Sequence, residues 1–170
     1  MSIIETISLI FLAVALICDV RDHKIPNVLN LVGAISGLLY HFCAGGWAGL
    51  VYSALGLAVG FTIVWFLYMT GAVGAGDVKL FAALGAWLGT VGVTYSVVYS
   101  ILYASLIGIV LLTLNGKITG LLRETVLWLW SKVVFGSSVR AWGNRGAPFH
   151  RIPFMLAVVP GVLSFILLPN

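Results

Sequence analysis

Two aspartates stand apart from the other acidic residues because each lies at the edge of an apolar run. Asp19 lies in the stretch CDVRDHKIPN, directly after one apolar run, and Asp77 lies in GAVGAGDVKL, between two more. If those runs are membrane helices, both carboxylates reach the same membrane face at a similar depth. Two carboxylates that share a water molecule can hydrolyse a peptide bond, because one accepts a proton from the water while its protonated neighbour polarises the carbonyl.

A purely structural role for both aspartates is the alternative. Asp19 would then pair with Arg21 or Lys24, and Asp77 would cap a helix, as aspartate often does. A carboxylate close to the hydrocarbon is nevertheless costly and is a functional candidate by default. The residues at these two positions leave both interpretations open.

Three glycines approach the second aspartate and favour a site there. They are Gly71, Gly74 and Gly76, in the run that ends at Asp77. Because glycine has no side chain, the backbone can come close to another helix or to an extended peptide substrate. Glycine is also common in membrane helices as a packing residue, so the run alone does not decide between a site and simple packing.

The composition predicts an integral membrane protein. The chain has 170 residues, of which 61% are hydrophobic and only 8% charged, whereas soluble domains carry about 25% charged residues. Its mean hydropathy is +1.13. We expect one domain over residues 1–170, because no linker and no large extramembrane block interrupts the apolar runs. The first run lacks a basic start and a cleavage site, so we expect it to be a membrane helix, not a cleaved signal.

Six apolar runs are candidates for membrane-spanning helices. A span needs about 20 apolar residues, so the shorter runs are expected to continue into the charged loops. The fold class predicted is therefore an all-α membrane protein with about six transmembrane helices. The candidate spans are Ile3–Ile17, Val28–Phe42, Trp47–Met69, Val78–Val93, Tyr95–Leu114 and Ile152–Leu168.

The distribution of basic residues predicts the orientation of these spans. All nine Lys and Arg fall in, or at the borders of, the loops after the first, third and fifth spans. Basic loops stay on the cytoplasmic side. We therefore expect a multi-pass protein of the cytoplasmic membrane with both termini outside and with Asp19 and Asp77 facing the cytoplasm.

The segment Gly116–Arg151 is expected to contain a surface helix instead of a seventh span. Its apolar stretch ITGLLRETVLWLWSKVV is interrupted by Arg123, Glu124 and Lys132, too many charges for a helix that faces lipid. Such a pattern is typical of an amphipathic helix that lies on the cytoplasmic membrane surface.

No metal or cofactor site is expected. The two cysteines, Cys18 and Cys43, are too few and too far apart for a CxxC device. The three histidines, His23, His41 and His150, fall in different loops or at opposite faces, which argues against a shared metal ion.

The two aspartate motifs resemble those of a known family. GAGD at Gly74–Asp77, followed by VK, resembles the GxGD motif of the membrane aspartic proteases. DVRDHKIPN at Asp19–Asn27 is similar to the first-aspartate motif of type IV prepilin peptidases, and IPFMLAVVPG at Ile152–Gly161 resembles the last helix of that family. The resemblance extends over nearly the whole chain in order and spacing.

The resemblance implies an inner-membrane endopeptidase with Asp19 and Asp77 as its catalytic pair. It would cut the short basic leader from a prepilin on the cytoplasmic side, with no cofactor. Larger members carry a cytoplasmic insertion with paired CxxC motifs, associated with methylation; this chain has no CxxC, so we expect a peptidase-only form. The short form resembles the peptidases of Flp-type, tight-adherence pilins and the archaeal preflagellin peptidases, and we favour the first.

Six further residues are expected to bind the substrate or shape the site. The basic ones could bind an acidic group of the pilin, influence the aspartates or fix topology, and Asn27 could cap a helix or touch the substrate. These six residues are Gly74, Gly76, Lys79, Arg21, Lys24 and Asn27.

Two other classes of function are compatible with the chain. A small transporter or channel subunit would bind protons or cations at its aspartates, although the carboxylates lie at the membrane border and no inverted repeat is visible. A non-enzymatic subunit of pilus assembly would tolerate Asp→Asn at both positions. The expected partners are a prepilin and the lipid bilayer, with no nucleic acid, and a homo-oligomer is left open.

Overall fold

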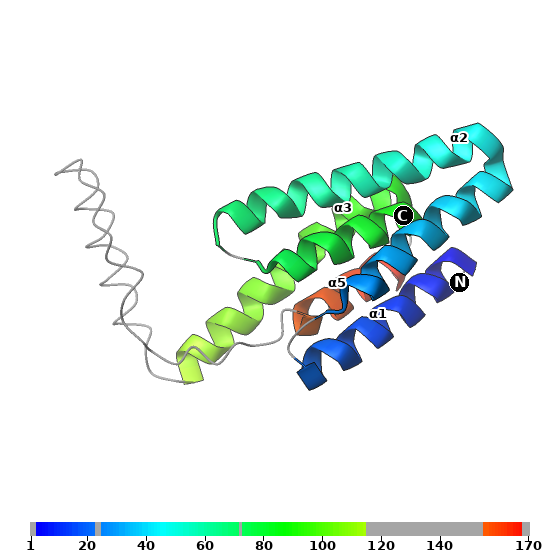
Figure 1. The fold of residues 1–170 in the computed structure, drawn as a ribbon. Coiled ribbons are helices and arrows are strands. Elements are labelled where there is room, and N and C mark those ends of the chain that lie inside the picture. The colour runs from blue at the N-terminus through cyan, green and yellow to red at the C-terminus, as the bar shows by residue number, and fades with distance from the viewer. Residues whose placement is uncertain (1–2, 23–24, 72, 115–154, 168–170) are drawn as a thin grey trace, which may run out of the picture. The chain divides into compact units, whose positions relative to one another are not determined.

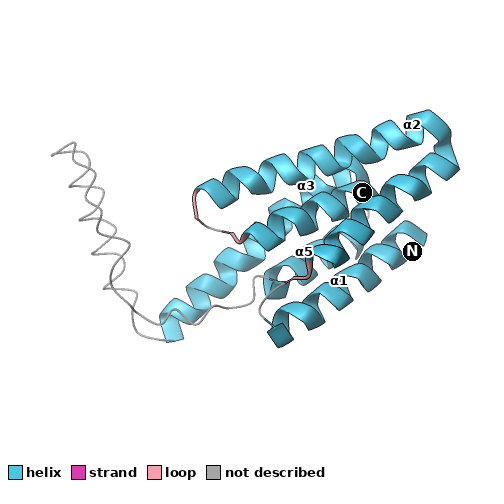
Figure 2. Ribbon diagram, in the orientation of Figure 1, coloured by secondary structure: helices cyan, strands magenta, loops and turns pink. Residues whose placement is uncertain are grey.

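The computed structural model describes residues 3–22, 25–71, 73–114 and 155–167, and nearly all of these residues are helical. No strand occurs within those ranges. Residues up to Ala104 together with the carboxyl-terminal helix form one compact unit. The helices, shown in Figures 1 and 2, are α1 (Ile3–Asp22), α2 (Asn27–Met69), α3 (Ala75–Leu114) and α5 (Met155–Leu167).

Three of these helices, α1, α2 and α3, are long and apolar enough to cross a membrane, and α5 is a shorter apolar helix. The all-helical part of the predicted fold is therefore confirmed for the described ranges. The predicted surface helix within Gly116–Arg151 lies outside them.

Helix α2 reverses direction at Gly46. This residue has φ 57° and ψ −139° inside a segment of 43 residues, which would be about 65 Å long if it were straight. The rings of His41 and Tyr52 lie 5.2 Å apart, although their positions would be separated by about 16 Å along a straight helix. Positive φ is readily adopted only by glycine. The two arms of α2 consequently lie side by side near the turn, as Figure 1 shows.

Helix α3 is interrupted in the same way at Gly89, which has φ 71° and ψ −176°. A break of this kind leaves the preceding carbonyls without their helical N–H partners. Side chains of α2 take their place. Ser53 donates to the carbonyl of Ala86 at 2.6 Å, and the hydroxyl of Tyr52 donates to that of Leu88 at 3.1 Å.

A third side chain completes this arrangement. The Nε2 atom of His41 lies 3.1 Å from the carbonyl oxygen of Trp87 and acts as its donor. The indole N–H of Trp87 in turn donates to the carbonyl of Gly33 at 2.9 Å. The interrupted end of the first arm of α3 is therefore satisfied by α2, which is essential where no water is available.

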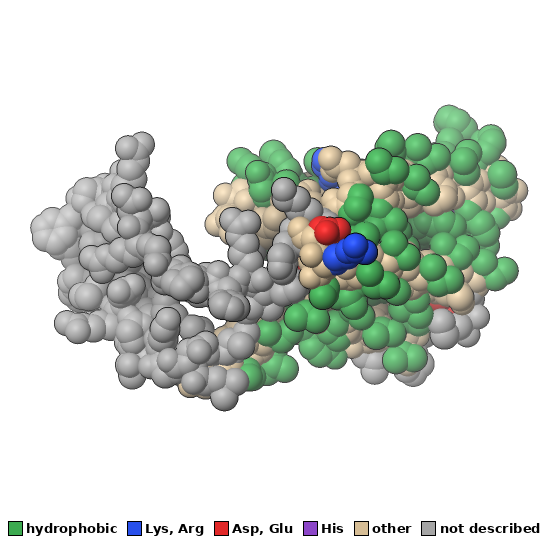
Figure 3. All heavy atoms as spheres, turned by 60° about the horizontal axis from the view of Figure 1, so that its bottom comes forward, with side chains coloured by type: hydrophobic (Ala, Val, Ile, Leu, Met, Phe, Trp, Pro, Cys, Tyr) green, Lys and Arg blue, Asp and Glu red, His purple; other side chains and the backbone are tan. Residues whose placement is uncertain are grey.

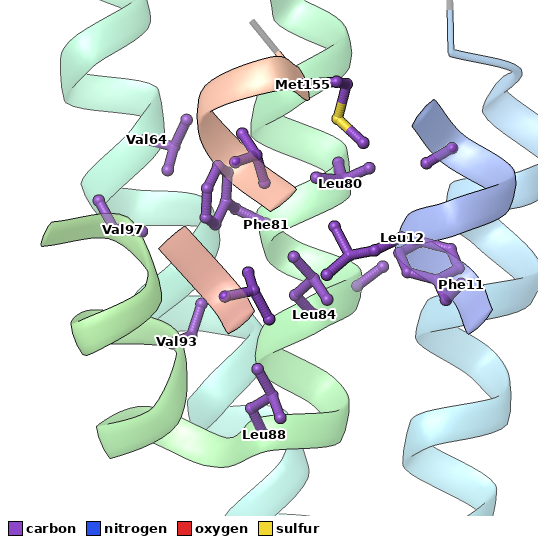
Figure 4. Packing of buried hydrophobic residues seen from close by; sticks show 14 of the residues in the cluster. Phe11, Leu12, Val64, Leu80, Phe81, Leu84, Leu88, Val93, Val97 and Met155 are labelled. Carbon is purple, nitrogen blue, oxygen red and sulfur yellow. The ribbon is translucent and has the colours of Figure 1, made fainter. Parts of the chain in front are cut away.

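The first arm of α3, residues 75–88, is the centre of the packing. Every residue from Leu80 to Leu88 is buried, as is typical of a helix that is apolar on all sides. Figure 4 shows Phe81 and Leu84 of this arm among side chains from the other helices, including Leu12 of α1 and Met155 of α5.

Close helix contact depends on glycine at one crossing in particular. A Cβ atom added at Gly56, in the second arm of α2, would meet the backbone carbonyl of Gly85 in α3, and the reverse also holds. Small residues let membrane helices approach until their backbones touch. This contact fixes α2 against the central arm of α3.

One predicted boundary agrees with the structure and one does not. Helix α1 continues beyond Ile17 to Asp22, as expected for the shorter runs, and this places Asp19 within the helix. The boundary expected between Val93 and Tyr95 is wrong, because α3 is interrupted at Gly89. Hydropathy does not mark this break, since both sides of it are apolar, and its position is set by a glycine backbone and by capping groups from α2.

A substitution at the tight crossing tests this packing. Gly56→Ala should destabilise the protein by about 1 to 3 kcal/mol, the range typical of overpacked sites, because its Cβ would collide with the backbone of α3. Gly108→Ala is the matched control, since nothing lies within 4 Å of a Cβ at that position among the described residues. Thermal unfolding in detergent measures both, and equal stability of the two variants would contradict the packing.

Candidate active site

Asp77 lies in the first turn of α3 and closes that turn with its side chain. The N–H of Gly74 donates to Oδ2 of Asp77 at 3.2 Å, and the N–H of Asp77 donates to the carbonyl of Gly74 at 3.1 Å. An acidic side chain that reaches back to the N-cap N–H forms one half of a capping box. Asp77 therefore caps α3, as the structural interpretation expected, and it does so with one carboxylate oxygen, Oδ2.

Asp77 is buried as well as capping α3. The residue is only 8% exposed. Asp19, in the last turns of α1, is half-buried, and its charge acts on Asp77 less strongly than burial and the hydrogen bond from Gly74 do.

The alternative in which Asp19 is neutralised by Arg21 is not observed. Within the described part of the chain Arg21 is exposed and forms no ion pair with Asp19. Lys24, the other candidate partner, lies outside the described residues.

On the face drawn in Figure 3, most of the visible charged side chains gather in one area, whereas the surrounding described surface is largely hydrophobic.

The first turns of α2 form a third side of the site. Lys79 donates from Nζ to Oδ1 of Asn27 at 2.8 Å, and both side chains are exposed. Lys79 is thus directed toward α2 and not toward the aspartates. The sequence left the roles of Lys79 and Asn27 open, and the structure shows that they bind each other and link the starts of α2 and α3.

A second link between the same helices was not anticipated from the sequence. Asn30 donates from Nδ2 to the carbonyl of Gly76 at 3.4 Å, and its side chain is 3% exposed. The sequence does contain a signal for this link. Asn30 is a polar residue in an apolar run, and it lies three positions after Asn27, hence on the same helix face.

The two glycines assigned to the site differ in their surroundings. A Cβ added at Gly74 would lie 3.2 Å from Oδ2 of Asp77, whereas one added at Gly76 would meet only Ile25, at 3.9 Å. Gly74 therefore leaves room for the Asp77 carboxyl. Gly76 contributes through its backbone carbonyl.

Among the residues that the structure describes, no three His, Cys, Asp or Glu side chains are grouped so that they could hold a metal ion. The absence of a cofactor stays an expectation.

Comparison with known proteins identifies similar chains. A model of the type IV leader peptidase family matches residues 6–113, a range that includes Asp19 and Asp77. A prepilin leader peptidase/N-methyltransferase of Pectobacterium carotovorum is 39% identical over 90 residues, which cover 49% of this chain and 32% of that protein. The protein of the same name from Aeromonas hydrophila is 30% identical over 135 residues, covering 73% and 46%.

A third relative with this name, from Pseudomonas putida, is 30% identical over 141 residues, covering 76% of this chain and 48% of that protein. The chain thus spans between about a third and a half of the length of these relatives. No solved structure matches.

The contrast between the two glycines gives a test of the site. Gly74→Ala should lower cleavage of a prepilin leader, the activity named for the relatives, by about tenfold or more, because displacing a catalytic group by less than 1 Å can cost that much. Gly76→Ala should cost clearly less. Initial rates with one prepilin measure both variants, and an equal or larger loss for Gly76→Ala would contradict the geometry.

Proposed function

The chain belongs to the type IV leader peptidase family, and from this premise we propose that it is a membrane-embedded aspartic endopeptidase. Its substrate is a prepilin, from which it removes the short basic leader at the cytoplasmic face of the inner membrane. The Flp type of prepilin, of the tight-adherence machinery, is the substrate that we favour, because of the resemblance in the motif from Asp19 to Asn27.

The observation that carries this proposal is a buried carboxyl group, Asp77, at the start of the central arm of α3. The charge of Asp19, at the end of α1 and distant in the chain, acts on Asp77, and among the described residues Arg21 does not neutralise Asp19. A like-charge pair costs stability, which favours a functional reason for its presence.

The proposed reaction uses one water and one shared proton. One carboxylate takes a proton from a water molecule held between Asp19 and Asp77, and the water oxygen bonds to the carbonyl carbon of the scissile peptide. The protonated carboxyl gives its proton to the carbonyl oxygen, which leaves a gem-diol carbon between the two groups. The C–N bond then breaks as the amine takes a proton from the pair and one gem-diol hydroxyl returns a proton to it, so the leader departs with the new carboxyl group. The pair ends with one proton, as it began.

The proposed topology has six membrane spans and both termini outside. Support comes from the interruptions of α2 at Gly46 and of α3 at Gly89, each of which divides one long helix into two arms. With α1 and α5, these arms give six apolar segments. The concentration of Lys and Arg in alternate loops favours a cytoplasmic position for Asp19 and Asp77.

Substitution of each aspartate tests the proposed reaction. Asp19→Asn and Asp77→Asn should each lower leader removal by about 10²- to 10⁴-fold, the usual contribution of a general acid or base. An amide keeps the shape of the side chain but cannot exchange the proton. Mass spectrometry of a co-expressed Flp-type prepilin measures the loss of the leader.

The matched control for this experiment is Asp22→Asn. Asp22 is exposed at the end of α1, so its substitution should leave cleavage nearly unchanged. Membrane insertion and yield should be similar for all three variants. Near-normal cleavage by Asp19→Asn or by Asp77→Asn would contradict the mechanism. If the unsubstituted protein leaves the prepilin uncleaved, that prepilin is not its substrate.

Cysteine labelling tests the proposed orientation. In a background with Cys18→Ser and Cys43→Ser, Gly45→Cys beside the α2 turn should react with a membrane-impermeant thiol reagent in intact cells, because nothing described lies within 4 Å of a Cβ there. Asp22→Cys should react only after the inner face is opened. The opposite pattern would reverse the orientation and the side of the active site.

A further inference from the structure

Asn30 lies in the second turn of α2 and reaches the backbone immediately before Asp77. Its Nδ2 atom donates to the carbonyl of Gly76 at 3.4 Å. This carbonyl belongs to the peptide unit that joins Gly76 to Asp77, so its orientation and that of the Asp77 backbone are coupled. A contact of this length is long for an N–H···O bond, and catalytic hydrogen bonds often tighten only when substrate is bound.

The first turn of α3 holds this peptide unit through the Asp77 N–H, which donates to the carbonyl of Gly74, and Asn30 adds a side-chain contact from α2. Gly76 has no side chain, and even an added Cβ would contact only Ile25, at the outer limit of van der Waals distance. The neighbouring link between Lys79 and Asn27 is exposed. Of the two side-chain links from α2 to the start of α3, Asn30 therefore provides the buried one.

The other polar atom of Asn30 indicates that stability is not the reason for this residue. Its Oδ1 atom is buried and has no hydrogen-bond partner, a condition shared, in the described part of the chain, with Oγ of Ser8. Leaving a buried acceptor unpaired lowers stability. A leucine at position 30 has the same branching and number of side-chain heavy atoms and leaves no polar atom unpaired, although its methyl groups are bulkier.

We propose that Asn30 is a positioning residue for the peptidase reaction. Its carboxamide fixes the peptide unit between Gly76 and Asp77, and thereby keeps the Asp77 carboxyl oriented toward Asp19. This inference rests on the proposed function, since it needs a reaction in which the two carboxyl groups cooperate. It assigns no contact between Asn30 and the substrate.

The test separates a positioning role from a structural one by measuring stability and kinetics on the same variants. Asn30→Leu in the full chain, purified in detergent, should unfold close to the temperature of the unsubstituted protein. Its kcat for a prepilin should fall by about 10- to 100-fold, as expected for a misplaced catalytic group. KM should stay nearly constant, because Asn30 does not bind the substrate.

Two further variants make the result decisive. Asn30→Ala should show the same loss of kcat if the bulk of leucine is not the cause. Ser8→Ala removes the other unpaired buried polar atom, and Ser8 lies about 16 Å from Asp19 along α1; this variant should keep full activity.

Unchanged kcat in both Asn30 variants would overturn the inference, as would losses of activity that match losses of stability in both. The proposed function is tested separately. It is supported if the unsubstituted protein cleaves the prepilin and Asp77→Asn does not. A loss of kcat in Asn30→Leu and Asn30→Ala at unchanged stability is the result that supports the positioning role.

Discussion

The enclosure of the first arm of α3 by the other helices is the constraint on which the site depends. From Leu80 to Leu88 this arm has no exposed residue, so its axis is fixed by contacts on every side. Asp77 lies at the amino-terminal end of this arm, so the contacts that fix the arm also fix the position of Asp77. Leu12 of α1 belongs to the same buried cluster as this arm, as Figure 4 shows.

The interruption of α3 follows from the same enclosure. A central helix that turns back at Gly89 exposes carbonyl groups in surroundings without water, and such groups must find partners. The hydrogen bonds from His41, Tyr52 and Ser53 supply them. The two ends of the central arm are thus held in different ways, by side-chain capping from α2 at one end and by the Asp77 carboxyl and the α2 asparagines at the other.

The sequence was sufficient to single out Asp19 and Asp77 as candidates, but it did not identify the groups that contact them. Asp19 and Asp77 are recognisable because each charge lies at the edge of an apolar run. In the structure these apolar runs form helices, with Asp19 near the end of α1 and Asp77 near the start of α3. The turn at Gly89 was missed because the chain has 20 glycines and hydropathy does not tell which one adopts a positive φ. The partners of Lys79 and Asn30 depend on how α2 and α3 pack, and this is a property of tertiary contact that no local pattern specifies.

We propose that Asp19 and Asp77 face each other across α1 and α3. Bridging of Asp19→Cys with Asp77→Cys by a short bifunctional thiol reagent, in a chain with both native cysteines replaced by serine, tests this proximity. A single added linker mass on the intact protein, with neither thiol left free, is expected. Glu5→Cys paired with Asp77→Cys should not be bridged, because Glu5 lies about 21 Å from Asp19 along the helix. Equal bridging of the two pairs, or none in either, would show that the two aspartates do not face each other.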